Sequence, residues 1–149
     1  MKSMLIVDDE PGARLSLEAI FKNSHIVVPA AAAKGSRQIL KGQMFESALL
    51  DGIRPEENGI ELLAYIQEHY PHLAVVMVSA STSVKPVVDA MREGAIDYIT
   101  KPYDVDAIRI TVDEALSKPV PLKKEKARIK QESKEYKTDD IIGDSNILQ

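Results

Sequence analysis

The sequence predicts an α/β fold in which five parallel strands form one doubly wound sheet with helices on both faces. Short apolar runs rich in branched residues alternate with segments whose apolar residues recur at helical spacing. Because these runs are apolar on both faces, they fit a parallel sheet that is covered on both sides. At 149 residues, 44% of them hydrophobic, the chain suits one such domain with a tail.

Each element follows from its own residue pattern. The predicted strands are Met4–Asp8, His25–Ala30, Ser47–Asp51, Ala74–Ala80 and Ala95–Thr100. Four helices are marked by one apolar face each, at Ala13/Leu17/Ile20/Phe21, Leu62/Leu63/Ile66/Tyr70, Val84/Val87/Val88/Met91 and Ile108/Val112/Ala115/Leu116. A weaker pattern predicts a further helix at Gly35–Lys41, after the second strand. With right-handed crossovers, five such units favour the strand order 2-1-3-4-5.

The end of the chain differs from its body. Pro119 and Pro121 stop the last helix, so we expect the domain to comprise residues 1–117. Residues 118–137 carry eight Lys or Arg against three Glu, whereas residues 1–117 carry 11 Lys or Arg against 17 Asp or Glu. This composition predicts a charged linker, either extended or helical. Without interleaved aromatic residues or a DNA-reading motif, it does not favour nucleic-acid binding.

The sequence also limits the cellular compartments in which the protein is expected. It contains no cysteine, which excludes a disulfide framework and thiolate metal sites. No apolar run reaches membrane-spanning length, and the opening "MKSMLIVDDE" turns acidic too soon for a signal peptide. We therefore expect a cytoplasmic protein that does not contact a membrane.

The stretch "LLDGIRPEENG" ends an apolar strand on Asp51 and continues at once into loop residues. An aspartate in this place has two interpretations. It is either the N-cap of a following helix, or a carboxylate held at the end of a strand for chemistry. In an open parallel sheet, ligands bind outside the carboxyl ends of the strands, near the switch between the first and third strands.

Two further carboxylates are predicted at the same edge. Asp8 and Asp9 follow the first strand, and the order 2-1-3 makes that strand a neighbour of the one that ends at Asp51. Like charges this close repel unless a cation joins them. Mg²⁺ takes carboxylate, carbonyl and water oxygens, so the carbonyl of Ile53 is a further candidate ligand. The alternative for "DDEPG" is a helix cap followed by Pro11 in the first turn.

Ser79 ends the fourth predicted strand in "VVMVSAS", and Lys101 follows the fifth in "DYITKPY". Taken alone, the serine is an ordinary cap and the lysine an ordinary surface charge. Taken together, they place a hydroxyl and an ammonium beside a metal-bound carboxylate. Such a set would neutralise a phosphoryl group in transfer, whose transition state needs positioned positive charge.

The motifs "VDDE", "LLDGIRPEENG", "VSA" and "DYITKPYD" resemble, in order and spacing, those of bacterial response-regulator receiver domains. The resemblance implies a flavodoxin-like (βα)5 fold and makes Asp51 the phospho-acceptor. It implies that Asp8 and Asp9 help to hold Mg²⁺, and that Lys101 pairs with the phosphoryl group. Ser79 and the aromatic Tyr98 become the switch residues, although a tyrosine in a strand also fits a plain core role. The bond between Lys101 and Pro102 is typically cis in the family.

The chain departs from the family pattern around the acceptor. Arg54 stands where receivers usually have methionine, and Gly52 replaces an aliphatic residue. We expect Pro86 in the first turn of the fourth helix, where proline is tolerated. None of these departures removes a residue of the predicted site.

The segment "DDIIGDSNILQ" in residues 138–149 resembles the start of the AAA+ ATPase domain in sigma-54-dependent activators of the nitrogen-regulator type. The resemblance implies that the native protein continues into an ATPase, that a sensor histidine kinase donates the phosphoryl group, and that the chain forms a homodimer. The chain has no G-x-x-x-x-G-K-[ST] loop and no DNA-binding helix pair. We therefore expect a regulatory domain that contacts no DNA and is not itself an enzyme, beyond assisting its own phosphorylation and dephosphorylation.

Three rival functions remain to be weighed. A haloacid-dehalogenase phosphatase also uses an aspartyl nucleophile with Mg²⁺, but it needs a second aspartate at position 53, which is Ile53. A flavodoxin-like carrier needs a phosphate-cradling loop after the first strand, where "DDEPG" is acidic. A receiver that works as an interaction module without phosphorylation keeps the same fold, and the acidic set lowers that alternative without excluding it.

Overall fold

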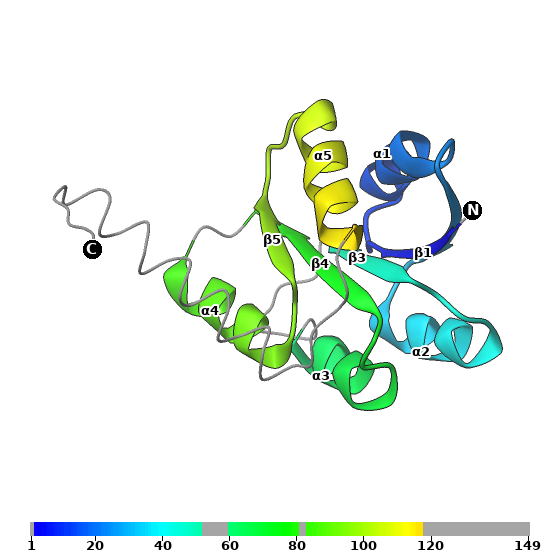
Figure 1. The fold of residues 1–149 in the computed structure, drawn as a ribbon, viewed down its shortest axis with the longest axis vertical. Helices are drawn as coiled ribbons and strands as arrows, with labels where there is room; N and C mark the ends of the chain where they lie inside the picture. Colours follow the sequence, from blue (N-terminus) through cyan, green and yellow to red (C-terminus); the bar gives the residue numbers. More distant parts are fainter. Residues whose placement is uncertain (1, 52–59, 81–82, 118–149) are drawn as a thin grey trace, which may run out of the picture.

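The structure is a computed structural model that describes residues 2–51, 60–80 and 83–117. Within these ranges five strands alternate with five helices (Figure 1). The predicted linker at residues 118–137, the segment 138–149 and the loop positions Gly52, Ile53 and Arg54 lie outside the described residues. None of the described helices combines the length and the apolar character needed to cross a bilayer.

The strands and helices alternate strictly along the chain. The strands are β1 (Lys2–Val7), β2 (His25–Ala30), β3 (Ser47–Asp51), β4 (Ala74–Ser79) and β5 (Asp97–Thr100). The helices are α1 (Pro11–Phe21), α2 (Ala33–Gly42), α3 (Ile60–His69), α4 (Val84–Glu93) and α5 (Val105–Leu116). The last helix ends one residue before the boundary that Pro119 and Pro121 predict.

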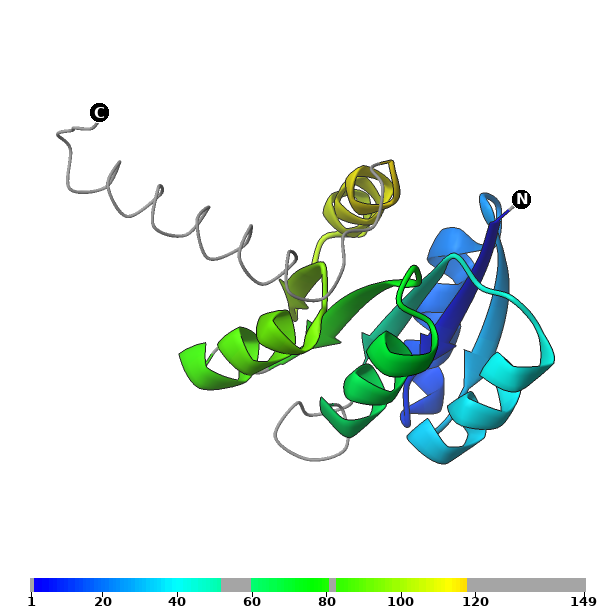
Figure 2. The same ribbon diagram turned by 60° about the horizontal axis from the view of Figure 1, so that its bottom comes forward.

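All strand pairs are parallel, and the strand order is β2-β1-β3-β4-β5. The predicted doubly wound topology is therefore confirmed. Figure 2 shows the strands side by side, with α2 in cyan and α3 in green in front of them. Because β1 and β3 are neighbours, Val7 and Leu50 lie in register, which brings the carboxyl ends of these strands to one edge.

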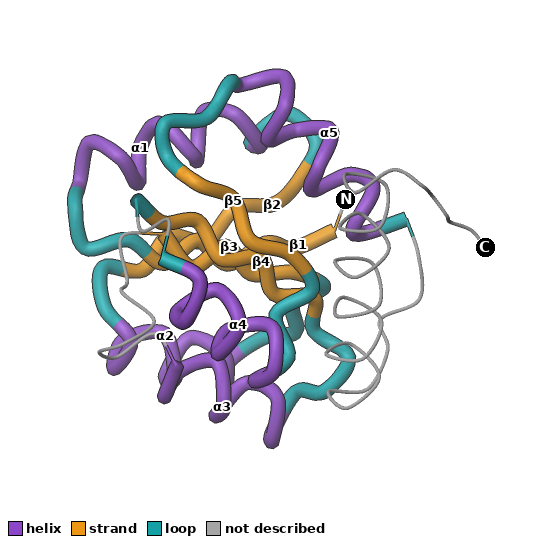
Figure 3. Tube along the Cα trace, turned by 90° about the vertical axis from the view of Figure 1, so that its left-hand side faces the viewer, coloured by secondary structure: helices purple, strands orange, loops and turns teal. Residues whose placement is uncertain are grey.

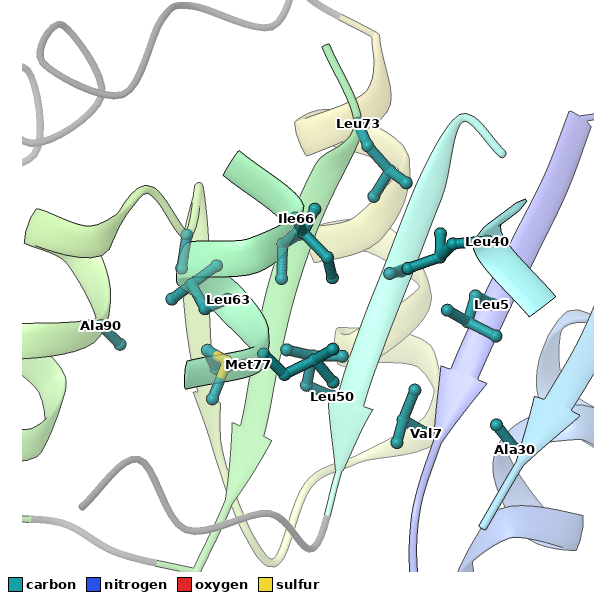
Figure 4. Packing of buried hydrophobic residues seen from close by; sticks show 14 of the residues in the cluster. Leu5, Val7, Ala30, Leu40, Leu50, Leu63, Ile66, Leu73, Met77 and Ala90 are labelled. Atoms are coloured by element: carbon teal, nitrogen blue, oxygen red, sulfur yellow. The ribbon is translucent and has the colours of Figure 1, made fainter. Parts of the chain in front are cut away.

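The helices form two layers around the sheet. Figure 3 shows α1 and α5 on one face and α2, α3 and α4 on the other. Alternate strand residues face the two layers, so that Leu49 packs with the α1–α5 side and Leu50 with the α2–α3–α4 side. Figure 4 shows the hydrophobic core on the α2–α3–α4 side, in which Leu5, Leu50 and Met77 from the sheet meet Leu63 and Ile66 of α3.

Local residues define the helix starts. The side chain of Glu10 accepts a hydrogen bond from the backbone N–H of Ala13 and so caps α1, while Pro11 takes the first helical position. Asp104 caps α5 in the same way, 3.0 Å from the backbone nitrogen of Ala107. Pro86 lies in the first turn of α4, as predicted.

Gly94 is the C-cap that follows α4, and its φ of 120° is one that residues with a side chain rarely adopt. The backbone N–H groups of Gly94 and Ala95 both donate to the carbonyl of Ala90. A Cβ atom at Gly94 would lie 2.5 Å from the side chain of Gln67. The glycine is thus required twice, by its backbone angle and by the approach of α3.

Several predicted boundaries were wrong by one or two residues. β1 begins at Lys2 rather than Met4 and ends at Val7 rather than Asp8, and β4 ends at Ser79 rather than Ala80. β5 begins at Asp97 rather than Ala95, because Ala95 is used to close α4. The helix predicted weakly at Gly35–Lys41 is longer, at Ala33–Gly42.

Candidate functional site

Asp51 is the last residue of β3 and is wholly buried. It pairs in register with Val78 of β4, whereas the first described residue of α3 is Ile60. Asp51 therefore belongs to the strand and does not adjoin the described start of α3. Of the two interpretations of this aspartate, the structure favours a carboxylate held at the carboxyl end of the sheet.

Lys101 reaches Asp51 from the end of β5. Its Nζ atom lies 2.6 Å from Oδ1 of Asp51, and its side chain is 28% exposed. The backbone N–H of Lys101 donates to the carbonyl of Ser79 at 2.9 Å, which ties the end of β5 to the end of β4. The bond from Lys101 to Pro102 is cis. The lysine is therefore a partner of the Asp51 carboxylate and not a freely solvated surface charge.

Ser79 is the last residue of β4 and is 5% exposed. It does not cap the next helix, because the N-cap of α4 is Ser83. Ser79 therefore lies at the same edge of the sheet as Asp51 and Lys101. This placement fits the predicted role.

Asp8 directly follows β1 and is wholly buried. Its Oδ1 atom accepts a hydrogen bond of 2.9 Å from the backbone N–H of Glu10. Among the described residues, Oδ2 of Asp8 and Oδ2 of Asp51 have no hydrogen-bond partner. Since a buried polar atom without a partner is unfavourable, these two oxygens point to a group that is bound during function.

Burial is the main cause that raises the pKa of Asp51 to about 7; Lys101 opposes this rise and the neighbouring carboxylate of Asp8 adds to it. For Lys101, burial alone would lower the pKa, but the Asp51 carboxylate outweighs it and the pKa is raised. In the absence of a metal, the carboxyl group of Asp51 therefore titrates near neutral pH, while Lys101 stays charged.

The residues fit a hard divalent cation. Mg²⁺ would supply the positive charge that two neighbouring buried carboxylates lack, and it binds oxygen ligands such as these. Asp9 is exposed and directly follows Asp8, so it adjoins the pair without being packed against it. Within residues 2–51, 60–80 and 83–117, no three acidic or imidazole groups form a ready-made metal cluster. Ile53 lies outside the described residues.

Tyr98 lies in β5 and is half-buried. Together with Val87 of α4, it packs against the core on the α2–α3–α4 side. This contact suits both interpretations of the residue, because a tyrosine at the margin of the core either fills space or changes position there.

Three residues near the site were not singled out from the sequence. The N-cap of α1 is Glu10, so neither Asp8 nor Asp9 has that role. Arg14 donates from Nη1 to the carbonyl oxygen of Asp8 at 2.7 Å. Tyr103 is half-buried, and burial together with the charge of Asp51 raises its pKa. The contact of Arg14 could have been predicted from the sequence, because an arginine four residues after the N-cap lies one turn along the helix, on the side of the preceding loop.

Comparisons with known proteins show which family this chain resembles. The family model described as "Response regulator receiver domain" matches residues 4–113. The response regulator protein PilR of Pseudomonas aeruginosa is 35% identical over 113 residues, which are 75% of this chain and 25% of PilR. The chemotaxis protein CheY of Listeria monocytogenes is 35% identical over 117 residues, which are 77% of this chain and 98% of CheY.

Among solved structures, NtrX from Brucella abortus in complex with ADP is similar to this chain with a TM-score of 0.70 and 27% identity. The match covers 99% of this chain and 31% of that one. The chain thus spans about a quarter of the length of the curated relative PilR and nearly the whole of CheY.

Proposed function

This chain belongs to the response-regulator receiver family, and we propose that it accepts a phosphoryl group on Asp51 from a sensor histidine kinase with the help of Mg²⁺. The observation that carries the proposal is the pair of the buried Asp51 with Lys101, 2.6 Å apart, beside the unpartnered oxygen of Asp8. A structural ion pair needs no second buried carboxylate next to it, whereas a Mg²⁺ site that serves phosphoryl transfer is built from such carboxylates.

In the proposed step, a carboxylate oxygen of Asp51 forms the new bond to phosphorus while the phosphorus–nitrogen bond of the phosphohistidine breaks. The electron pair of that bond stays on the imidazole of the kinase, which then takes a proton from water. Asp51 must be deprotonated to attack, and its pKa of about 7 keeps a large fraction in that form at neutral pH. Lys101 balances the charge that develops on the phosphoryl oxygens. When bound, Mg²⁺ neutralises these oxygens further.

We extend the proposal to the switch. The Ser79 hydroxyl turns onto a phosphoryl oxygen, and Tyr98 moves into the space that this movement opens. Tyr98 lies in β5 and packs with Val87 of α4 against the core, and Ser79 is hydrogen-bonded to Lys101 at the end of β5. The exposed apolar side chains of Val84, Val105 and Ile110 lie on α4 and α5. A face of this kind is suited to a second copy of the chain, so phosphorylation shifts the population toward a dimer.

The subgroup is proposed from the relatives and from the tail. PilR is about four times as long as the matched region, and the match to NtrX continues into the tail of this chain. This supports a receiver that controls the AAA+ domain of a sigma-54-dependent transcription activator through the linker at residues 118–137. In this role the chain works in the cytoplasm, acts as a regulatory domain and leaves contact with DNA to other domains.

The proposal is tested by the intact mass of the chain after incubation with Mg²⁺ and acetyl phosphate. We expect a gain of one phosphoryl group in the wild type and none in Asp51→Asn or without Mg²⁺. Asp89→Asn is the matched control, because Asp89 is an exposed carboxylate paired with Lys85 on α4. Light scattering on the same samples reports whether the phosphorylated chain dimerises.

A mass gain that persists in Asp51→Asn would overturn the assignment of the acceptor. No gain in any sample, followed by no gain with a kinase as donor, would favour the alternative receiver that signals as an interaction module without phosphate. A phosphorylated monomer would leave the acceptor in place and overturn only the proposed dimer.

A further inference from the structure

Arg14 connects the first turn of α1 to the acidic loop before it. Its backbone N–H donates to the carbonyl of Glu10 at 3.0 Å, as expected inside a helix. Its side chain turns back beyond the start of the helix, and Nη1 donates to the carbonyl oxygen of Asp8 at 2.7 Å. A hydrogen bond from a guanidinium is stronger than one between neutral groups, so this contact holds the loop firmly.

As a result, Asp8 is held at three points. Its backbone N–H donates to the carbonyl of Ala30 in β2 at 3.0 Å. Its own carbonyl accepts from Arg14, and its Oδ1 atom accepts from the backbone N–H of Glu10 at 2.9 Å. Only Oδ2 lacks a partner among the described residues. Backbone and side chain of Asp8 are thus oriented together, and the direction of the remaining oxygen is set by the other three contacts.

Arg14 has two opposite effects on a cation at this place. Its positive charge repels a divalent ion, which by itself would weaken binding. Its contact with the carbonyl of Asp8 fixes the backbone from which a candidate ligand carboxylate projects, and partners that orient a ligand strengthen metal binding. The charge is spread over a planar group and is directed at a backbone carbonyl, which limits its repulsion of the ion, whereas the same contact holds the backbone that carries the Asp8 carboxylate. We therefore expect the second effect to exceed the first.

We propose that Arg14 is a positioning residue for the Mg²⁺ site, which it serves by holding the loop between β1 and α1 so that Asp8 and Asp9 present their carboxylates. The inference rests on the proposed function, because it assumes that Mg²⁺ binds beside Asp51. Arg14 itself touches neither the ion nor the phosphoryl group.

The test is a Mg²⁺ titration of the metal-free chain, followed by the amide NMR shifts of ¹⁵N-labelled protein. The chain contains no tryptophan, so intrinsic tryptophan fluorescence cannot serve as the signal. We expect Arg14→Gln to weaken Mg²⁺ binding about tenfold, the lower end of the range for residues that orient a metal ligand. Arg14→Lys keeps the charge and a donor, so it should recover part of the affinity.

Arg92→Gln is the matched control, because it removes the same charge from an exposed position in the last turn of α4. We expect its Mg²⁺ affinity to equal that of the wild type. Unchanged or tighter binding in Arg14→Gln would overturn the inference, since it would mean that removal of a repelling charge outweighs any loss of orientation. The sign of the change therefore separates the two effects.

A second measurement needs no metal. Hydrogen exchange at the amide of Glu10 reports on its hydrogen bond to Asp8. We expect faster exchange in Arg14→Gln at this amide, with little change in the amides of β3 and β4. Exchange that speeds up equally across the sheet would overturn a positioning role and indicate a general loss of stability. If Arg14→Gln does not fold, Arg14→Lys provides both measurements.

The two proposals fail in different ways. A wild type that binds no Mg²⁺ would overturn the proposed function, and this inference with it. A wild type whose Mg²⁺ binding depends on Asp51 and not on Arg14 would leave the function intact and remove only the role of Arg14.

Discussion

His25 and Asp51 are both buried ionisable residues of this sheet, but they lie at its opposite ends and differ in their hydrogen-bond partners. His25 begins β2, shares a hydrogen bond of 2.9 Å with Ser24 Oγ, and meets Phe21 edge-on at a ring distance of 5.8 Å. Asp51 ends β3 beside a second carboxylate, and one of its oxygens has no hydrogen-bond partner among the described residues.

This difference shows how a buried ionisable residue that only supports the fold can be distinguished from one that belongs to a functional site. Burial lowers the pKa of His25, so the ring stays neutral and its polar atom is satisfied by a neighbour in the chain. Burial raises the pKa of Asp51 to about 7, although Lys101 is 2.6 Å away. A buried group whose needs are met inside the chain is part of the fold, whereas one that remains unmet marks a place for a ligand.

The largest effect is expected from Asp51→Asn in the metal-free chain. Because the pKa of Asp51 is higher in the folded chain than its ordinary 3.8, the stability linked to this group is lost as the pH rises from about 4 to about 7. The difference between the two pKa values corresponds to a change of about 4 kcal/mol in the free energy of unfolding. An asparagine does not ionise, so the variant should unfold at higher urea concentration than the wild type at pH 8, with little difference at pH 4.

Asp89→Asn again serves as the control. Asp89 forms an exposed pair with Lys85 in α4, and removal of such a pair changes the free energy of unfolding by less than about 0.5 kcal/mol. If Asp51→Asn were less stable than the wild type at pH 8, the buried carboxylate would be well satisfied after all. The contrast between Asp51 and His25 would then be lost.

A smaller effect is expected from Mg²⁺. An ion that binds only the folded chain stabilises it by about 1.4 kcal/mol when present at ten times its Kd. We expect this gain in the thermal unfolding of the wild type at pH 8 and its near absence in Asp51→Asn. Equal gains in both proteins would place the bound ion elsewhere and break the link between the unpartnered oxygens and the metal.

The smallest effect is expected at the other end of the sheet. Because the pKa of His25 is lowered in the folded chain, its contribution to stability is present above its ordinary value of 6.5 and is lost as the pH falls through the folded value. Lys2 also lowers the pKa, while Asp113 of α5 and Glu46 oppose both effects.

His25→Phe keeps a ring against Phe21 and removes the titration. Urea unfolding at pH 7.5 and pH 5 should show a smaller acid-induced loss of stability in this variant than in the wild type. His72→Gln, at an exposed position, is the matched control and should follow the wild type. Equal losses in His25→Phe and the wild type would mean that His25 carries no pH dependence.

The fold was predictable because its pattern is redundant. Each strand is a short apolar run, and parallel strands buried on both faces leave few topologies. The boundaries were less predictable, because long-range partners decide them. Lys2 and Ser3 extend β1 although they are polar, since Lys2 pairs with His25 and the N–H of Ser3 donates to the side chain of Glu46 at 2.6 Å. No local pattern contains these contacts.

The site was predictable to the extent that it follows from strand order. Asp8, Asp51, Ser79 and Lys101 each end a strand or follow one directly, so the topology alone brings them to one edge. Arg14 was missed because helix faces were read from their apolar positions, whereas its contact runs backward into a loop. The role of Glu10 was also hidden, because any of three consecutive acids suits a cap and only the backbone geometry selects one.

The tight exit from α4 at Gly94 also sets the phase of β5, which starts three residues later. Side chains alternate across a strand, so one residue inserted between Gly94 and β5 would exchange its two faces. Tyr98 would turn away from α4, and the alignment that joins Lys101 to Ser79 would be lost. Insertions and deletions in this short connection should therefore be tolerated far less than substitutions, and its length is as much a part of the site as the residues that it delivers.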